Sequence, residues 1–287
     1  MKAYAIVLLL SLAAAGDIFP KPTSVQPDEC SKKVIPYGDK VTDRVFTLDL
    51  ASPGGGHLLY LGAARHSSDP SDPEFVDFEK SWNDFKPTIA FYEGGTQNRV
   101  AASRDEAIKT SGEPGLVMFL AARDKIAAVS LEPGRQDEVN YLLQEFSPEQ
   151  VKLFYVLRII RELRDKDKHS EAELRAEVGK LLDLFSKYKG LESVLQDPAQ
   201  LEAAYHRYWK SPENWWEAPA VWFDPRTSSS KTGGVFTNEV NQRSSGYRDL
   251  YMYELLAKAA LDGKRVFAIV GRDHVPMQAP ALRCALK

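Results

Sequence analysis

The stretch Val266-Phe267-Ala268-Ile269-Val270-Gly271-Arg272-Asp273-His274 decides the fold class, because a continuous apolar run ends in a glycine and then in polar residues. A run without polar alternation is typical of a strand in a parallel sheet that is covered on both faces. Leu59-Tyr60-Leu61-Gly62-Ala63-Ala64-Arg65-His66 repeats this pattern near the start of the chain. We therefore expect two buried parallel strands that each bring a histidine to one edge of a sheet.

Shorter apolar runs alternate with helical patterns between these two stretches. Strands are predicted at residues 45–50, 57–61, 88–92, 126–131 and 266–270. A helix begins at the cap Asp72-Pro73-Glu74, and another lies within 113–123. The alternation predicts an α/β fold with a mostly parallel central sheet flanked by helices.

The middle of the chain is mainly helical, which predicts a helical insertion at about 136–225 in a single α/β domain over residues 41–287. Ser147-Pro148-Glu149-Gln150 has the form of a capping box at a helix start. Residues 227–246 are predicted to form a loop, and 247–261 a helix. The tryptophan-rich stretch 209–222 is interpreted as a small satellite core, or alternatively as an aromatic lid or stacking platform over a cleft.

The first residues have the layout of an export signal. Lys2 precedes a ten-residue apolar run, and Ala13-Ala14-Ala15 follows it, which predicts a signal peptide over 1–15 with cleavage near Ala15. A Pro-rich leader is predicted over 16–40. Export, periplasmic or secreted, places Cys30 and Cys284 in an oxidising compartment, where they form either a disulfide between the two ends or two free thiols.

The composition narrows the possible partners. The chain has 287 residues, 37 basic against 40 acidic, and a net charge of −3, so no basic excess exists to neutralise nucleic acid. No apolar run in the mature chain is long enough for a membrane span. The sequence also lacks a Gly-x-Ser-x-Gly elbow and a Walker A motif, and we expect a peptide or small-molecule substrate.

Polar residues follow four of the predicted strands, at residues 62–66, 93–95, 130–133 and 271–274. Two imidazoles and a carboxylate at one sheet edge could hold a divalent metal with an open position, or the histidines could be structural. Glu132 is either a second cleft carboxylate or a strand-end cap. Asp273 either orients His274 or faces solvent.

Residues 57–94 and 245–280 resemble the TraB/GumN/Tiki family, which belongs to one superfamily with erythromycin esterases and ChaN-like haem-binding lipoproteins. The resemblance rests on Leu59–His66, on Lys86–Gly94, and on Tyr247–Met252 followed by Gly263–His274. The second of the two Gly-x-x-His (GxxH) motifs of the family is intact here. In the first, Gly62 lies four residues before His66, so the motif is one residue longer.

By this resemblance, His66, Glu93, Arg248 and His274 form the site of an exported metal-dependent hydrolase, possibly a peptidase as in Tiki-like members. His66 and His274 would be metal ligands, with Glu93 a ligand or general base. Arg248, placed at the start of the penultimate helix where its charge opposes the helix dipole, would pair with Glu93 or stabilise negative charge.

Two alternatives remain open. In the first, a metal-independent hydrolase similar to the esterase relatives uses His66 or His274 directly as a base. In the second, the protein is a non-catalytic haem- or metal-binding protein, with Tyr92 or a strand-end histidine at a haem iron.

Overall fold

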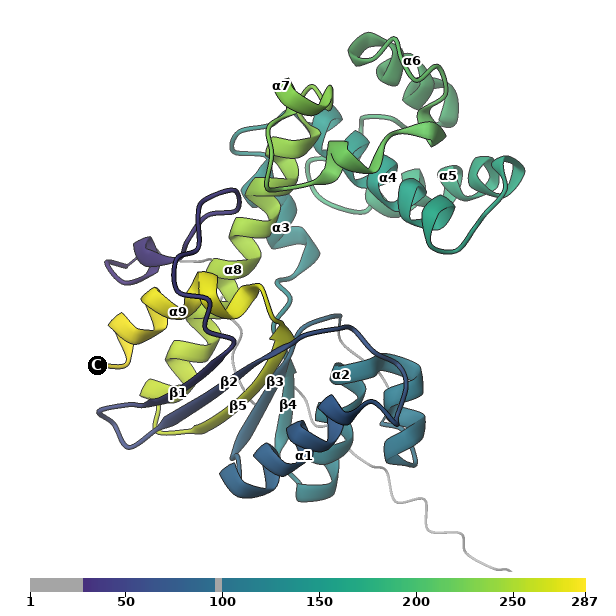
Figure 1. The fold of residues 1–287 in the computed structure, drawn as a ribbon. Helices are drawn as coiled ribbons and strands as arrows, with labels where there is room; N and C mark the ends of the chain where they lie inside the picture. Colours follow the sequence, from purple (N-terminus) through teal and green to yellow (C-terminus); the bar gives the residue numbers. More distant parts are fainter. Residues whose placement is uncertain (1–27, 96–99) are drawn as a thin grey trace, which may run out of the picture.

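The computed structural model describes residues 28–95 and 100–287. The predicted signal peptide and residues 16–27 of the predicted leader lie outside these residues. Figure 1 shows the chain coloured along its sequence.

Five strands form one sheet: β1 (Thr47–Ala51), β2 (His57–Ala63), β3 (Ile89–Tyr92), β4 (Ala127–Ser130) and β5 (Arg265–Gly271). Their order is β1-β2-β5-β3-β4, with β1 antiparallel to β2 and every other neighbouring pair parallel. The strand that comes last in the sequence, β5, therefore lies at the centre. The predicted α/β fold with a mostly parallel sheet is confirmed, and each predicted strand matches an observed one to within two residues.

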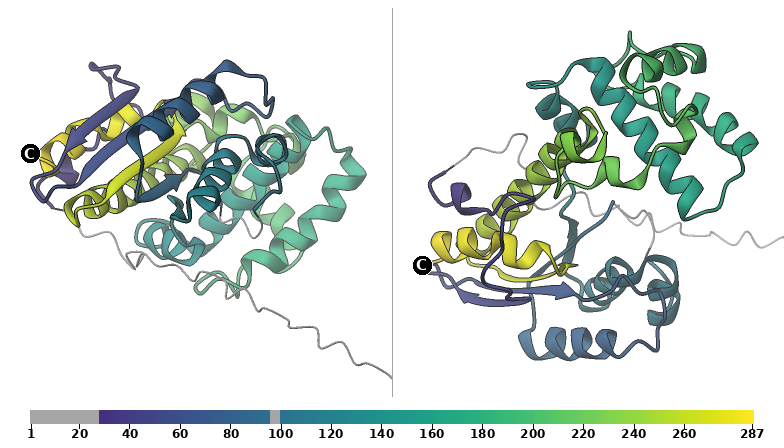
Figure 2. Two further views of the ribbon diagram at one scale, coloured as in Figure 1. Left: turned by 90° about the horizontal axis from the view of Figure 1, so that it is seen from below. Right: turned by 45° about the horizontal axis from the view of Figure 1, so that its top comes forward.

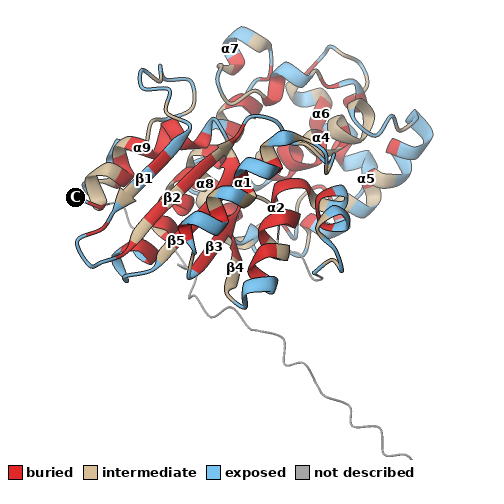
Figure 3. Cartoon of the chain, turned by 60° about the horizontal axis from the view of Figure 1, so that its bottom comes forward, coloured by how far each residue is buried: buried red, intermediate tan, exposed pale blue. Residues whose placement is uncertain are grey.

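Helices cover both faces of the sheet (Figure 1): α1 (Pro73–Phe85) and α2 (Arg104–Asp124) on one face, and α8 (Thr237–Leu261) and α9 (His274–Ala285) on the other. Successive side chains of β5 point to opposite faces, so Phe267 and Ile269 pack against α1 and α2, while Val266, Ala268 and Val270 pack against α8 and α9. Figure 3 shows the central strands coloured mostly as buried. Two-sided burial explains why β5 is apolar from Val266 to Val270.

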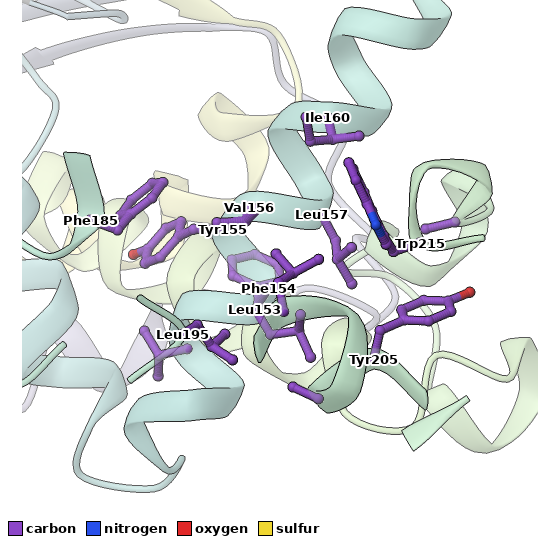
Figure 4. Packing of buried hydrophobic residues seen from close by; sticks show 14 of the residues in the cluster. Leu153, Phe154, Tyr155, Val156, Leu157, Ile160, Phe185, Leu195, Tyr205 and Trp215 are labelled. Atoms are coloured by element: carbon purple, nitrogen blue, oxygen red, sulfur yellow. The ribbon is translucent and has the colours of Figure 1, made fainter. Parts of the chain in front are cut away.

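The helical part between β4 and β5 has its own core. Its elements are α3 (Arg135–Leu142), α4 (Pro148–Asp165), α5 (Glu171–Phe185), α6 (Pro198–Tyr208), η2 (Trp215–Glu217), η3 (Ala220–Phe223) and the short α7 (Ser229–Thr232). The capping box at Ser147 is present, with both hydrogen bonds made. Aromatic and aliphatic side chains from α4, α5 and α6 meet in this core (Figure 4). Trp209, Trp215, Trp216 and Trp222 are buried within it, which confirms the satellite core and not the lid.

The helix α8 joins the two parts, and its start corrects one prediction. The helix begins at Thr237, ten residues before the predicted start at 247. The polar side chains that suggested a loop are buried and bonded: Asn238 and Asn241 donate to backbone carbonyls of residues 221, 223 and 224. Arg248 therefore lies inside the helix and does not open it, so the argument from the helix dipole is wrong. Figure 2 shows α8 running from the helical part to the sheet.

Residues 28–46, which we call the strap, lie against α8 and α9 (purple in Figure 1) and include the short helix η1 (Ser31–Lys33). Cys30 forms a disulfide with Cys284 of α9, with 5.5 Å between the Cα atoms. Ile35 donates its backbone N–H to the carbonyl of Met277, and Gln242 of α8 donates to the carbonyl of Tyr37. The cysteines are thus paired, and the strap is fixed to both helices.

Candidate functional site

Four strand ends bring their polar residues to one edge of the sheet. His66 follows β2, Glu93 follows β3 directly, and Glu132 lies two positions after the end of β4. His274 is the first residue of α9, three positions after β5. Since β2, β5, β3 and β4 are parallel neighbours in this order, their carboxyl ends are adjacent.

Arg248 of α8 binds the two glutamates. Its guanidinium donates to both carboxylate oxygens of Glu132, with distances of 2.7 and 2.5 Å, and to Glu93 Oε1 at 3.2 Å. The geometry with Glu132 is the bidentate fork that arginine makes best. Glu132 is therefore a carboxylate of the site, and Arg248 has the partner Glu93 that the sequence suggested.

Glu93 is held from three sides. Its Oε2 accepts the backbone N–H of Gly271 at 2.7 Å, and its Oε1 lies 3.3 Å from Nε2 of His274. Burial would raise the pKa of Glu93, but the hydrogen bond and charge of His274 and the charge of Arg248 outweigh it and hold the pKa well below its usual range. Glu93 is therefore a permanent carboxylate that accepts hydrogen bonds and is a poor proton acceptor.

The ring of His274 lies between two carboxylates. Its Nδ1 is 2.6 Å from Oδ1 of Asp249, a fully buried residue of α8, and its Nε2 faces Glu93. Burial lowers the pKa of His274, but Asp249 and then Glu93 raise it more, to about 10. The side chain is only 9% exposed. At neutral pH it is an imidazolium that donates from both nitrogens.

His66 has a different environment, set by a kink in α2. Gly112 adopts a positive φ of 58° inside this helix, and Pro114 follows two residues later. A Cβ at Gly112 would lie 2.8 Å from the carbonyl oxygen of Ser67, so the loop carrying His66 packs directly on the kink. The kink turns Glu113 inward, where it is buried, with Oε2 at 3.7 Å from Nδ1 of His66.

The imidazole of His66 remains 72% exposed while Glu113 is buried beneath it. The carboxylate of Glu113 raises the pKa of His66 above its usual value, against the opposing effect of burial. Oε1 of Glu113 has no hydrogen-bond partner among the described residues. His66 is therefore a histidine whose second nitrogen, Nε2, is available to a ligand.

His66 and Glu93 meet at Gly271. A Cβ at this glycine would lie 3.3 Å from Nε2 of His66 and 3.3 Å from Oε2 of Glu93, closer than side chains normally pack. These residues line a cavity of about 210 Å³ together with Glu113, Glu132, Pro114 and Gly94. All four residues expected from the sequence, His66, Glu93, Arg248 and His274, are thus gathered around one sheet edge.

The predicted metal ligands do not fit a divalent ion in this arrangement. Both nitrogens of His274 face carboxylates as donors, and both oxygens of Glu93 already accept hydrogen bonds. Within residues 28–95 and 100–287, no group of three or more His, Cys, Asp or Glu side chains has the geometry of a metal site. The divalent metal stays a prediction from the resemblance.

The haem alternative also stays a prediction. Tyr92, its suggested ligand, is 2% exposed and packs in the core against α1 and α2.

In the part of the chain that the structure describes, no helix is both long and apolar enough to span a bilayer.

Sequence reasoning missed two residues of the site, Asp249 and Glu113. Asp249 follows Arg248 directly, and it takes the orienting role considered for Asp273, whose side chain is 75% exposed. A sequence signal existed for Glu113, because Gly112 and Pro114 flank a carboxylate inside an otherwise helical pattern. No signal marked Asp249, because its role depends on the packing of α8 against α9.

Comparison of the chain with protein-family models, with curated proteins and with solved structures gave no match. The family resemblance therefore rests on the sequence motifs and stays a prediction.

Proposed function

We propose that this chain is an exported hydrolase that cleaves an ester or peptide bond with water, using His66 as the general base. The observation that carries the proposal is the exposed imidazole of His66 on the buried carboxylate of Glu113. His66 lines a cavity together with Glu93, which pairs with Arg248 and His274. A histidine with one nitrogen oriented by a carboxylate and the other facing a cavity is the arrangement that general base catalysis needs.

In the proposed reaction, Nε2 of His66 takes a proton from a water molecule as the water oxygen attacks the carbonyl carbon. Glu113 stabilises the imidazolium that forms, since its carboxylate lies on the Nδ1 side. The carbonyl oxygen gains negative charge, and Arg248 and His274, which neutralise Glu93 and Glu132, keep these carboxylates of the cavity from repelling it. His66 then returns the proton to the leaving group.

Glu93 and Glu132 hold the two cations in place in this mechanism. The pKa of Glu93 lies too low for it to act as a base at neutral pH, whereas that of His66 is raised above 6.5 and suits proton transfer near neutral pH. This difference supports the metal-independent form of the hydrolase over the form in which Glu93 activates water.

The test uses purified protein with a panel of p-nitrophenyl esters and fluorogenic peptides. We expect His66→Gln to lower kcat/KM by about 10²–10⁴-fold, the usual contribution of a general base. His206→Gln on α6, a histidine of the helical part, is the matched control and is expected to leave kcat/KM unchanged. Equal activity of His66→Gln and the wild type, or no hydrolysis of any panel member by the wild type, would contradict the proposal.

A chelator separates the metal-independent form from the metal-dependent one. We expect activity to survive prolonged treatment with a strong chelator. Loss of activity that added zinc restores would show instead that the metal-dependent form is correct.

A further inference from the structure

A second cavity lies on the other side of the loop between β5 and α9. It has a volume of about 420 Å³, twice that of the cavity at His66. The strap forms one wall, and Arg272, Asp273 and the first turns of α9 form the other. Gly271 lines the first cavity, and the next residue in the chain lines the second. The two cavities therefore flank one short loop.

Cationic side chains gather around this second cavity. Lys40, Arg44, Arg226 and Arg272 line it, against the acidic residues Asp39 and Asp273, although the chain as a whole is net negative. Asp224 pairs with Arg226 at 3.0 Å. Lys40 and Arg44 are exposed and make no ion pair or hydrogen bond to another described residue. Two cations at the cavity are thus left without an anion.

The fold anchors the backbone on both walls of this cavity and holds the side chain of Arg272 in place. The guanidinium of Arg272 lies over the ring of Phe46, 5.6 Å from its centre, and its backbone packs so closely on Gly62 that a Cβ there would be 2.6 Å from the Cα of Arg272. The strap that carries Lys40 and Arg44 is held by the disulfide and by the bonds of Ile35 and Tyr37. An anion would therefore meet a preformed wall.

Tyr37 connects this cavity to the candidate site. It lines the second cavity, and its ring stands edge-on to the ring of His274 with 6.5 Å between the centroids. Tyr37 therefore contacts both the second cavity and the imidazolium ring of His274.

We propose that the second cavity binds an oxyanion, a carboxylate or a phosphate, carried by the substrate that the first cavity hydrolyses. Lys40 and Arg44 bind this group, and Arg272 contributes from the opposite wall. Carboxylates and phosphates are the anions that arginine recognises with two parallel hydrogen bonds. This inference names the substrate class of the proposed hydrolase and so rests on the proposed function.

Direct binding tests the site without any turnover. Inorganic phosphate and succinate are titrated into the full chain by calorimetry, and the tighter of the two identifies the oxyanion. We expect the double variant Lys40→Gln, Arg44→Gln to bind the tighter probe at least tenfold more weakly, and Lys40→Arg, Arg44→Lys to retain binding. The control Lys80→Gln, Lys180→Gln removes the same charge from α1 and α5 and is expected to bind as the wild type does.

Hydrolysis of a matched pair of esters tests the link to the substrate. The probes are p-nitrophenyl hexanoate and the mono-p-nitrophenyl ester of adipic acid, which has the same acyl length with a terminal carboxylate. We expect the ratio of kcat/KM for the anionic ester to that for the neutral ester to fall at least tenfold in Lys40→Gln, Arg44→Gln.

The outcomes distinguish the two proposals. Binding of neither probe, or equal binding by the double variant, overturns the anion site, and hydrolysis can still be present in that case. Anion binding that depends on Lys40 and Arg44 without hydrolysis of any ester or peptide overturns the proposed hydrolase and leaves the anion site standing. Hydrolysis with an unchanged ester ratio overturns the link to the substrate.

Discussion

The loops after β2 and β5 present the same residue type at the same sheet edge and give it opposite properties. The loop after β2 leaves His66 exposed, with one carboxylate beside it. The loop after β5 buries His274 at the start of α9, between Asp249 and Glu93. The first histidine can exchange a proton with a ligand, and the second is a fixed cation. The number of carboxylates and the degree of burial assign these roles, and the spacing of the motifs does not.

The extra residue in the first motif fits this difference. In the second motif, Gly271 and His274 are separated by two residues, and the histidine turns into α9. In the first, Gly62 is separated from His66 by three residues, and the chain continues as a loop up to α1. The longer loop brings His66 onto the kink of α2 at Gly112.

The disulfide restrains the strap and α9, the helix that begins at His274, and does not involve the loop of His66. Its removal is expected to have the largest effect on stability. Cys30 and Cys284 close a loop with a sequence separation of 254, for which chain entropy gives about 5 kcal/mol. We expect reduction to lower the Tm and to speed hydrogen exchange in the strap and α9. Exchange in the loop of His66 and in α2 should change far less. Equal acceleration of hydrogen exchange in these two regions would contradict the prediction that the disulfide restrains only the strap and α9.

The charge of His274 makes folding stability depend on pH. Its pKa is raised to about 10 in the folded protein, above the unfolded value of about 6.5. The stabilisation is therefore complete below about pH 6.5 and is lost as the pH rises through 10, by about 5 kcal/mol in total. Urea unfolding at pH 6, 8 and 10 measures this loss. The loss should be much smaller in His274→Gln, and an equal slope in both proteins would contradict the assignment.

Removal of the charge of Asp249 is expected to destabilise the protein by about 3 kcal/mol, because Asp249→Asn leaves the buried imidazolium of His274 with one carboxylate. Chemical unfolding at pH 7 measures the change in free energy. The control is Asp84→Asn, which breaks the exposed pair with Lys80 on α1 and should cost less than about 1 kcal/mol. A cost as small as the control would mean that His274 is neutral.

The smallest predicted effect is on the rate of hydrolysis. Glu113→Gln removes the carboxylate that raises the pKa of His66, so the pKa falls toward its ordinary value. Because the base acts unprotonated, the acidic limb of kcat/KM should move to lower pH. The plateau should fall by about tenfold, less than the 10²–10⁴-fold contribution of the base itself, because His66 is retained. An unmoved limb would show that Glu113 is only structural.

The strands of the sheet could be predicted from the sequence, whereas the helix α9 and the start of α8 could not. Continuous apolar runs marked the strands because two-sided burial removes polar residues, as in Val266–Val270. The helix α9 was not foreseen, since Pro276 and Pro280 interrupt its pattern. The start of α8 was misplaced because Asn238 and Asn241 have the composition of a loop and are bonded only through tertiary contacts.

The site residues at strand ends were predictable, because parallel strands share one carboxyl edge. Asp249 was not, because it acts from a helix whose orientation toward the sheet is set by packing. Gly112 and Pro114 mark Glu113 in the sequence, but its contact with His66 depends on how α2 packs against the loop after β2. The protonation state of each histidine depends on the carboxylate beside its Nδ1, which is Glu113 for His66 and Asp249 for His274. The Gly-x-x-His motifs contain neither carboxylate, so they do not predict the role of either histidine.

The cystine also has a consequence for the order of biosynthesis. Cys30 leaves the ribosome about 250 residues before Cys284, a delay of roughly 10–50 s at ordinary elongation rates. The chain contains only these two cysteines, so no incorrect intramolecular pair exists. The bridge requires α9, which follows the central strand β5, to be in place beside the strap. The disulfide therefore cannot form until β5, the central strand of the sheet, has already been synthesised.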